Sequence, residues 1–300
     1  MKTATAPASQ TAVGFRNILF ATDFSRSANQ AIPYVQKLAK HYDAELVALH
    51  VRVPVVNPMT EPATWPVYLE AAKALDHEHR EELLHTFSGI RTEVLIEEGS
   101  IGSCLEAAVA ENNTDLIVIG TQGRTGIPKL ILGSVAEEIF RTVHCPVLTV
   151  GPRCKQNDAP DGQFREILYA TDFSAESVGA AAYALTLAQE FQARLVLVHV
   201  ISDQQAGDLV SAADLTVSSH KMLRKLVSAE AEAWCKPEYF VVQGNPADKI
   251  LEFATMRESD LLVLGVRPQK GVLGASTHLP IATAHKIVSH AICPVLTVRH

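Results

Sequence analysis

A loop of small residues is the clearest sign of chemistry in this sequence. The loop contains Gly120, at the end of the apolar run DLIVIG, and then Gly123 and Gly133. Ser134 directly follows Gly133, at the start of an expected helix. Glycine lets backbone N–H groups approach an anion without a Cβ clash, and the free N–H groups at the start of a helix attract phosphate. The spacing is neither that of a Walker A loop nor GxGxxG. The loop therefore predicts a phosphate site of another kind, where the Ser134 hydroxyl adds a hydrogen bond.

Two other segments are expected to reach the same site. Ala21, Thr22 and Asp23 lie at the end of one apolar run, and His50 and Val51 lie at the end of the next. In a doubly wound sheet, ligands bind beyond the carboxyl ends of the strands. The two strand ends and the glycine loop should therefore converge on one crevice. For Asp23 the alternative is a purely local role at the start of the next helix, and His50 is expected to be a structural residue.

The elements that position these residues occur twice. RNILFATDFS at 16–25 returns as REILYATDFS at 165–174, and 17 of 36 positions are identical between 16–51 and 165–200. TDLIVIG has the counterpart SDLLVLG, and CPVLTV occurs in both halves. The sequence is therefore a duplicated domain. The expected parts are a flexible tail at 1–14, a first domain at 15–150, a polar linker rich in Gly and Pro at 151–163, and a second domain at 164–300.

Each copy alternates short apolar runs with helical segments. This alternation predicts a parallel sheet covered by helices on both faces, and right-handed crossovers make each domain a three-layer, doubly wound structure. The expected fold class is α/β, with two such domains, each built on a five-stranded parallel sheet.

The first copy resembles the universal stress protein family. ATP-binding members of that family carry G-x2-G-x9-G-[ST], and here the pattern is Gly120-x2-Gly123-x9-Gly133-Ser134. ATDFS, LHV, DLIVIG and CPVLTV follow in the family's order. The resemblance implies a strand order of 3-2-1-4-5 and ATP, accompanied by Mg²⁺, held at the strand ends.

The resemblance also implies roles for individual residues. Asp23 would hold the adenosine near its ribose, and Val51 would contact adenine through its backbone. The loop from Gly120 to Arg124 and the turn at 133–135 would hold the phosphates. The candidate binding residues are Ala21, Thr22, Asp23, Val51, Gly120, Gln122, Gly123, Arg124, Gly133, Ser134 and Val135. No catalytic residue and no metal-ligating side chain is assigned.

The second copy departs from the pattern in its loop. Gly265 is kept, but Pro268 stands in place of the second motif glycine, and Ile281 and Ala282 align with Gly133 and Ser134. Proline lacks an N–H donor, and isoleucine crowds the start of the helix. Nucleotide is therefore expected in the first copy, one per chain.

Composition excludes several classes of function. The chain has a formal charge of −7, which argues against a general nucleic-acid binder. No apolar run is long enough to span a bilayer, and the N-terminus has no apolar leader. Five widely spaced cysteines without a CxxC are typical of a reducing compartment, so a cytoplasmic protein is expected. His77, His79 and His85 are expected on a solvated helix face.

Three functions remain open at this stage. The first is an ATP-binding module of stress response or signalling, with an unknown protein partner and little or no catalysis. The second is a slow ATPase or a self-phosphorylating enzyme, and the third is a pseudo-dimer that works without nucleotide. In all three, the apolar CPVLTV strands would be bare sheet edges, so the two domains are expected to pair through them. A further homodimer is left open.

Overall fold

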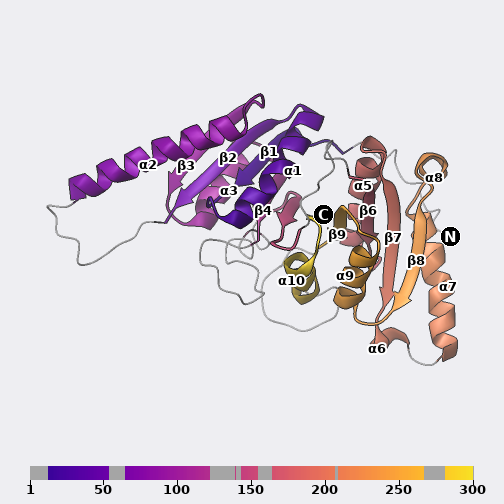
Figure 1. Ribbon diagram of the computed structural model, residues 1–300. Helices are drawn as coiled ribbons and strands as arrows, with labels where there is room; N and C mark the ends of the chain where they lie inside the picture. Colours follow the sequence, from indigo (N-terminus) through magenta and orange to yellow (C-terminus); the bar gives the residue numbers. More distant parts are fainter. Residues whose placement is uncertain are drawn as a thin grey trace. The chain divides into compact units, whose positions relative to one another are not determined.

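The computed structural model describes most of the chain and divides it into two compact units. The first unit is built mainly from Phe15–Gln156, and the second mainly from Asn157–Ile287 with Ala291–His300. We treat each unit separately (Figure 1). The residues that the structure describes are 13–53, 65–121, 139, 143–154, 164–206, 209–266 and 281–299.

The elements of each unit follow the alternation expected from the sequence. The first unit contains β1 (Asn17–Ala21), α1 (Arg26–Tyr42), β2 (Glu45–Arg52), α2 (Trp65–Thr86), β3 (Thr92–Glu98), α3 (Ile101–Glu111), β4 (Leu116–Gly120) and β5 (Val147–Val150). The second contains β6 (Glu166–Ala170), α5 (Ala175–Glu190), β7 (Arg194–Ile201), α6 (Asp203–Ala206), α7 (Leu209–Lys225), α8 (Ala229–Cys235), β8 (Glu238–Gln243), α9 (Pro246–Met256), β9 (Leu261–Gly265), α10 (Ile281–His290) and β10 (Val295–Val298).

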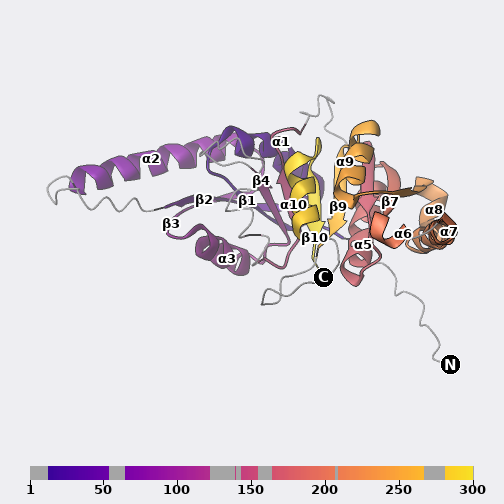
Figure 2. The same cartoon turned by 90° about the horizontal axis from the view of Figure 1, so that it is seen from below.

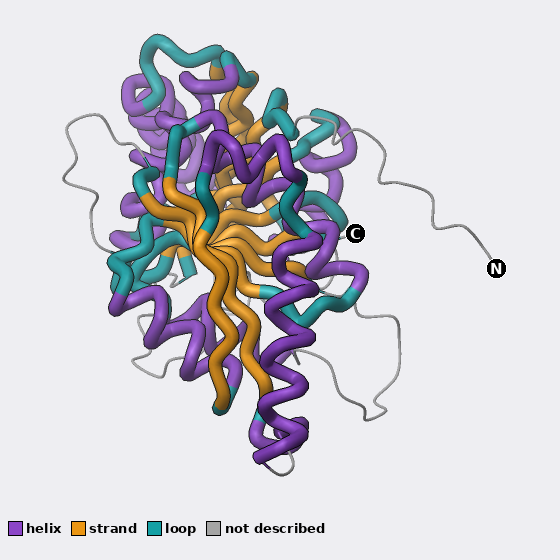
Figure 3. Tube along the Cα trace, turned by 90° about the vertical axis from the view of Figure 1, so that its right-hand side faces the viewer, coloured by secondary structure: helices purple, strands orange, loops and turns teal. Residues whose placement is uncertain are grey.

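Both units contain a parallel sheet with the expected strand order. In the first unit the order is β3-β2-β1-β4-β5, and in the second it is β8-β7-β6-β9-β10. Helices α1 and α2 cover one face of the first sheet and α3 the other, while α5 and α7 lie on the opposite face from α9 in the second (Figure 2). Figure 3 shows the strands lying between helices. The predicted α/β fold class and the order 3-2-1-4-5 are confirmed.

The central strands are buried because helices cover both of their faces. Leu19 and Phe20 in β1 and Ile117 and Val118 in β4 have no exposed surface. Such strands form continuous apolar runs rather than an alternating pattern. Among the described residues, no helix is both long and apolar enough to cross a membrane.

A glycine at the end of the fourth strand lets a helix approach the sheet in each unit. A Cβ on Gly120 would lie 2.7 Å from backbone atoms of Ser27 and Ala28 in α1, and a Cβ on Gly265 would lie 2.2 Å from the Cα of Ser177 in α5. The contacted atoms belong to the backbone, which moves less easily than the end of a flexible side chain. Both copies therefore keep this glycine for packing, whatever either unit binds.

Alanine at either glycine is expected to destabilise its unit. Overpacking usually costs about 1–3 kcal/mol, and we expect the larger loss in Gly265→Ala because its nearest contact is shorter. Urea unfolding of the two variants measures the effect. An unchanged midpoint in both variants would show that the helix start yields easily and that packing does not demand glycine.

Candidate functional site

The register of the first sheet brings three strand ends to the same level. Ala21 pairs with Leu49 of β2 and with Ile119 of β4. Two residues further along each segment are Asp23, Val51 and Thr121. Neighbouring strands lie about 4.8 Å apart, so Leu49, Ala21 and Ile119 form a row at the carboxyl edge of the sheet. The ends of the first two segments and the first residue of the glycine loop therefore lie at the same edge of the sheet.

Asp23 has a structural role in the turn between β1 and α1. Its Oδ1 accepts a hydrogen bond from the backbone N–H of Ser25 at 3.0 Å, and the Ser25 hydroxyl accepts one from the N–H of Ala28 at 3.1 Å as the N-cap of α1. Phe24, between them, has a φ of 58°, in the left-handed region. The local role considered for Asp23 is thus real, and it fixes the carboxylate at the sheet edge.

Thr121 is a buried polar residue that the sequence analysis did not single out. Only 3% of it is exposed, its backbone N–H donates to the Val150 carbonyl at 3.1 Å, and its hydroxyl has no hydrogen-bond partner in the described part of the chain. A buried hydroxyl without a partner is costly. Its counterpart in the second unit is Val266, whose N–H makes the same bond to Val298. The first unit alone therefore offers a hydroxyl here.

In the second unit the equivalent carboxylate is engaged by a serine. Asp172 Oδ1 accepts from the backbone N–H of Ser174 at 2.9 Å and from the hydroxyl of Ser177 at 2.6 Å. Ser177 is fully buried, and its carbonyl accepts a short hydrogen bond from the Tyr169 hydroxyl. Burial raises the pKa of that Tyr169 hydroxyl, which keeps it a donor.

The first unit cannot make this network. Ser177 lies three residues after the N-cap Ser174, as Ala28 lies three after Ser25, and Phe20 takes the place of Tyr169. Alanine and phenylalanine have no hydroxyl to donate. The two units therefore differ beside their aspartates in the described residues, and not in the loop sequence alone.

The repeated histidines at the ends of β2 and β7 are structural. The Nδ1 of His50 lies 2.8 Å from the Thr22 carbonyl oxygen, and the Nδ1 of His199 lies 2.8 Å from that of Thr171. Burial lowers the pKa of His199, so the neutral ring is favoured. The structural interpretation of His50 is confirmed.

The expectation of a solvated face for the α2 histidines is wrong for one of them. His77 and His85 are exposed, but only 7% of His79 is exposed. The His79 ring stacks on Phe24 with 4.0 Å between ring centroids, and it lies 5.1 Å from the His50 ring. His79 precedes the buried Leu83 by four residues, and that helical spacing was the signal for an inward-facing side chain.

Several predicted site residues lie outside the described residues. They are Gln122, Gly123, Arg124, Gly133, Ser134 and Val135. Pro268, which replaces the second motif glycine in the second copy, also lies outside the described residues. Of the remaining candidates, Ala21 ends β1, Thr22 and Asp23 follow it, Gly120 ends β4, and Val51 belongs to β2.

The fold therefore defines two doubly wound α/β domains in one chain. The sequence model of the universal stress protein family matches residues 14–151 and again 163–299. The chain therefore belongs to the universal stress protein family, with two family domains in one polypeptide.

Individual proteins agree with this assignment. Universal stress protein MJ0531 of Methanocaldococcus jannaschii is 31% identical over 140 residues, covering 45% of this chain and 82% of that protein. The crystal structure of a universal stress protein from Archaeoglobus fulgidus has a TM-score of 0.67 at 20% identity, covering 94% of this chain and 98% of that one. Protein PA1789 from Pseudomonas aeruginosa has a TM-score of 0.62 at 18% identity, covering 95% and 92%. These two structures share the fold.

Proposed function

We propose that the first unit binds ATP at the carboxyl ends of β1, β2 and β4, and that the chain is a nucleotide-dependent module of stress response or signalling in the cytoplasm. The observation that supports the proposal is that the segments leading to Asp23, Val51 and Thr121 reach the same carboxyl edge of the first sheet. A carboxylate, a strand backbone and a buried hydroxyl without a described partner occur at that edge. These groups fit a ligand that offers both hydroxyls and an apolar ring.

The proposed contacts combine the described strand ends with the loop that follows β4. Asp23 would accept a hydrogen bond from a ribose hydroxyl, and Val51 would contact the base through its backbone. Gly120, Gly123 and Arg124 with Gly133, Ser134 and Val135 would hold the phosphates, while Ala21 and Thr22 line the start of the site. Mg²⁺ would arrive with ATP and neutralise phosphate charge.

We propose one nucleotide per chain, because the second unit keeps Asp172 and Gly265 but differs from the first unit at three other points. Ser177 occupies the Asp172 carboxylate, Val266 replaces the hydroxyl of Thr121, and the loop carries Pro268. Isothermal titration calorimetry with Mg-ATP tests the number of sites. Two equivalent sites per chain would refute the assignment, and no binding at all would favour the pseudo-dimer that works without nucleotide.

We propose further that ATP is held rather than rapidly hydrolysed. Fast hydrolysis needs a positioned water and charges that act more strongly in the transition state, and the proposed contacts supply ground-state binding. Steady-state phosphate release at saturating Mg-ATP should therefore stay far below the roughly 1–1000 per second of typical enzymes. Gly133→Val, which should weaken ATP binding at least tenfold, serves as the control for contaminants. Turnover above about one per second that disappears in this variant would favour the ATPase instead.

We propose also that the chain has a protein partner and that its two domains pair. An unidentified protein would sense the nucleotide state, and the strands at 147–150 and 295–298 would pair the two domains.

A further inference from the structure

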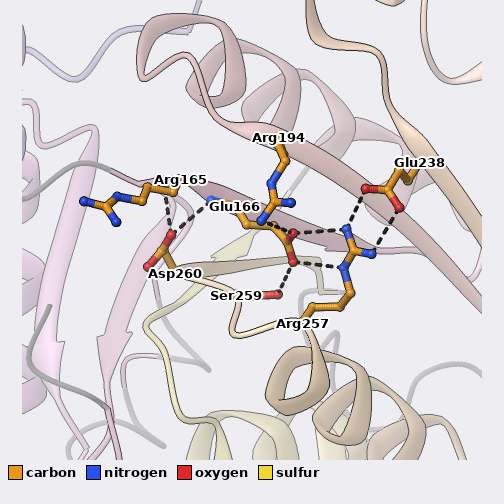
Figure 4. A network of polar contacts seen from close by, with 7 residues as sticks. All are labelled: Arg165, Glu166, Arg194, Glu238, Arg257, Ser259 and Asp260. Atoms are coloured by element: carbon orange, nitrogen blue, oxygen red, sulfur yellow. Dashed lines mark hydrogen bonds and ion pairs between the residues drawn. The ribbon is translucent and has the colours of Figure 1, made fainter. Parts of the chain in front are cut away.

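A buried carboxylate and an arginine form a closed network at the amino ends of the strands in the second unit (Figure 4). Arg257 donates to Glu166 from Nε at 3.2 Å and from Nη2 at 3.1 Å, and to Glu238 from Nη1 at 3.1 Å and from Nη2 at 2.6 Å. The Glu166 side chain is only 3% exposed and also accepts from Ser259 and pairs with Arg194. The guanidinium thus fills the space between two carboxylates.

The first unit keeps part of this framework, without the arginine and with Asn17 in the place of Glu166. Asn112 is the C-cap of α3, as Arg257 is the C-cap of α9. The register pairs Val47 with Glu93 in the first sheet and Val196 with Glu238 in the second. Glu93 is therefore the counterpart of Glu238, and Asn112 is the counterpart of Arg257.

A cavity lies in the first unit where the second holds its guanidinium. Its volume is about 270 Å³, and it is lined by Asn17, Glu45, Leu46, Val47, Arg91, Thr92, Glu93 and Asn112. Asn112 does not fill it, because its side-chain amide donates back to the Ala108 carbonyl at 2.8 Å. Within the described residues, the Glu93 carboxylate has no ion-pair partner.

The cation nearest to this cavity is anchored at its rim. Arg91 donates from Nη2 to the Asp43 carbonyl at 2.6 Å, and its Nη1 lies 3.5 Å from Glu45 Oε1. Its side chain is 61% exposed. Arg91 therefore neutralises Glu45 and leaves Glu93, an exposed carboxylate, as the acceptor in the lining of the cavity that has no ion pair in the described part of the chain.

We propose that this cavity of the first unit binds the guanidinium group of another molecule. The second unit shows that a planar guanidinium fits between strand-end residues at this position, held there by Glu166 and by Glu238, the counterpart of Glu93. Guanidinium matches a carboxylate with two parallel hydrogen bonds, which an ammonium cannot do. The cavity is at the amino ends of the strands, so it lies at the opposite edge of the sheet from the proposed nucleotide site.

NMR titration of the full chain tests this proposal with two guanidinium probes and one amine. Agmatine represents a free small molecule, the tripeptide Gly-Arg-Gly represents an arginine side chain of a protein, and cadaverine is the amine control. We expect shifts in the amides of 92–94, with at least one guanidinium probe binding several-fold more tightly than cadaverine. Tighter binding of agmatine identifies a small-molecule source, and tighter binding of the peptide identifies a protein source. Binding of neither probe, or equal binding of the amine, overturns the proposal.

Three variants connect the binding to this cavity. Glu93→Gln should weaken it about tenfold, as expected for a lost charge-assisted pair. Glu111→Gln is the control, since this exposed carboxylate on α3 does not line the cavity. Asn112→Arg should abolish binding, because the new side chain recreates the contact of Arg257. Unchanged affinity in both Glu93→Gln and Asn112→Arg would refute the site, and repeating the titration with Mg-ATP separates this result from the proposed function.

Discussion

Replacing Asp23 with alanine is expected to weaken ATP binding roughly 10- to 100-fold, because a hydrogen bond to a charged group contributes about 1.5–3 kcal/mol. In the proposed function its carboxylate accepts from the ribose. Part of the loss would come from the turn, since Asp23 Oδ1 also accepts from the N–H of Ser25. Calorimetry with Mg-ATP measures the change.

Two controls separate the contact with ligand from the turn. Asp23→Asn keeps an oxygen for the N–H of Ser25 but removes the charge, so it should still lose most of the affinity. Asp172→Ala removes the equivalent residue of the second unit and should leave ATP binding unchanged. If Asp172→Ala and Asp23→Ala weaken ATP binding equally, the ATP site is not specific to the first unit, and its proposed location there is wrong.

A serine at position 28 should give Asp23 the serine hydrogen bond that Asp172 accepts in the second unit. In the second unit Ser177 donates to Asp172 at 2.6 Å, and Ala28 occupies the equivalent place. Ala28→Ser should therefore engage the Asp23 carboxylate and lower ATP affinity, with Ser177→Ala as the matched variant that has no effect. Full affinity in Ala28→Ser would show that the serine is not what distinguishes the two units.

Replacing Arg257 with alanine is expected to destabilise the second unit by about 3 kcal/mol. Breaking a buried ion pair typically costs about 3–5 kcal/mol, because the remaining charge is left uncompensated. We expect the lower end of that range, since Arg194 and Ser259 still contact Glu166. Urea unfolding followed by circular dichroism measures the loss.

The matched control is Arg194→Ala. The Arg194 side chain is 69% exposed, so its ion pair with Glu166 should contribute less than about 1 kcal/mol. Adding ethylguanidinium to Arg257→Ala should restore part of the stability, whereas ethylammonium should not. Equal losses in the two variants would contradict the view that Arg257 is the principal partner of Glu166.

Much of the fold was predictable because short-range sequence patterns indicate the individual strands and helices. The apolar runs of β1 and β4 marked strands covered on both faces, and the central residues of both strands are buried. The repeat doubled each of these signals. For His79 the prediction failed, because the choice between a solvated and a buried face depended on how α2 packs over Phe24 and His50.

By itself, the sequence determined the duplication, the α/β class, the family and the asymmetry of the two glycine loops, since each is written in residue types at fixed spacing. Only the tertiary structure decided which residues meet across strands. The register placed the end of β4 beside the end of β1, and packing against α1 explained Gly120. The contacts of Ser177 with Asp172 and of Arg257 with Glu166 likewise depend on distances between elements. Such distances follow from how helices and sheet pack together, and no local pattern along the chain encodes them.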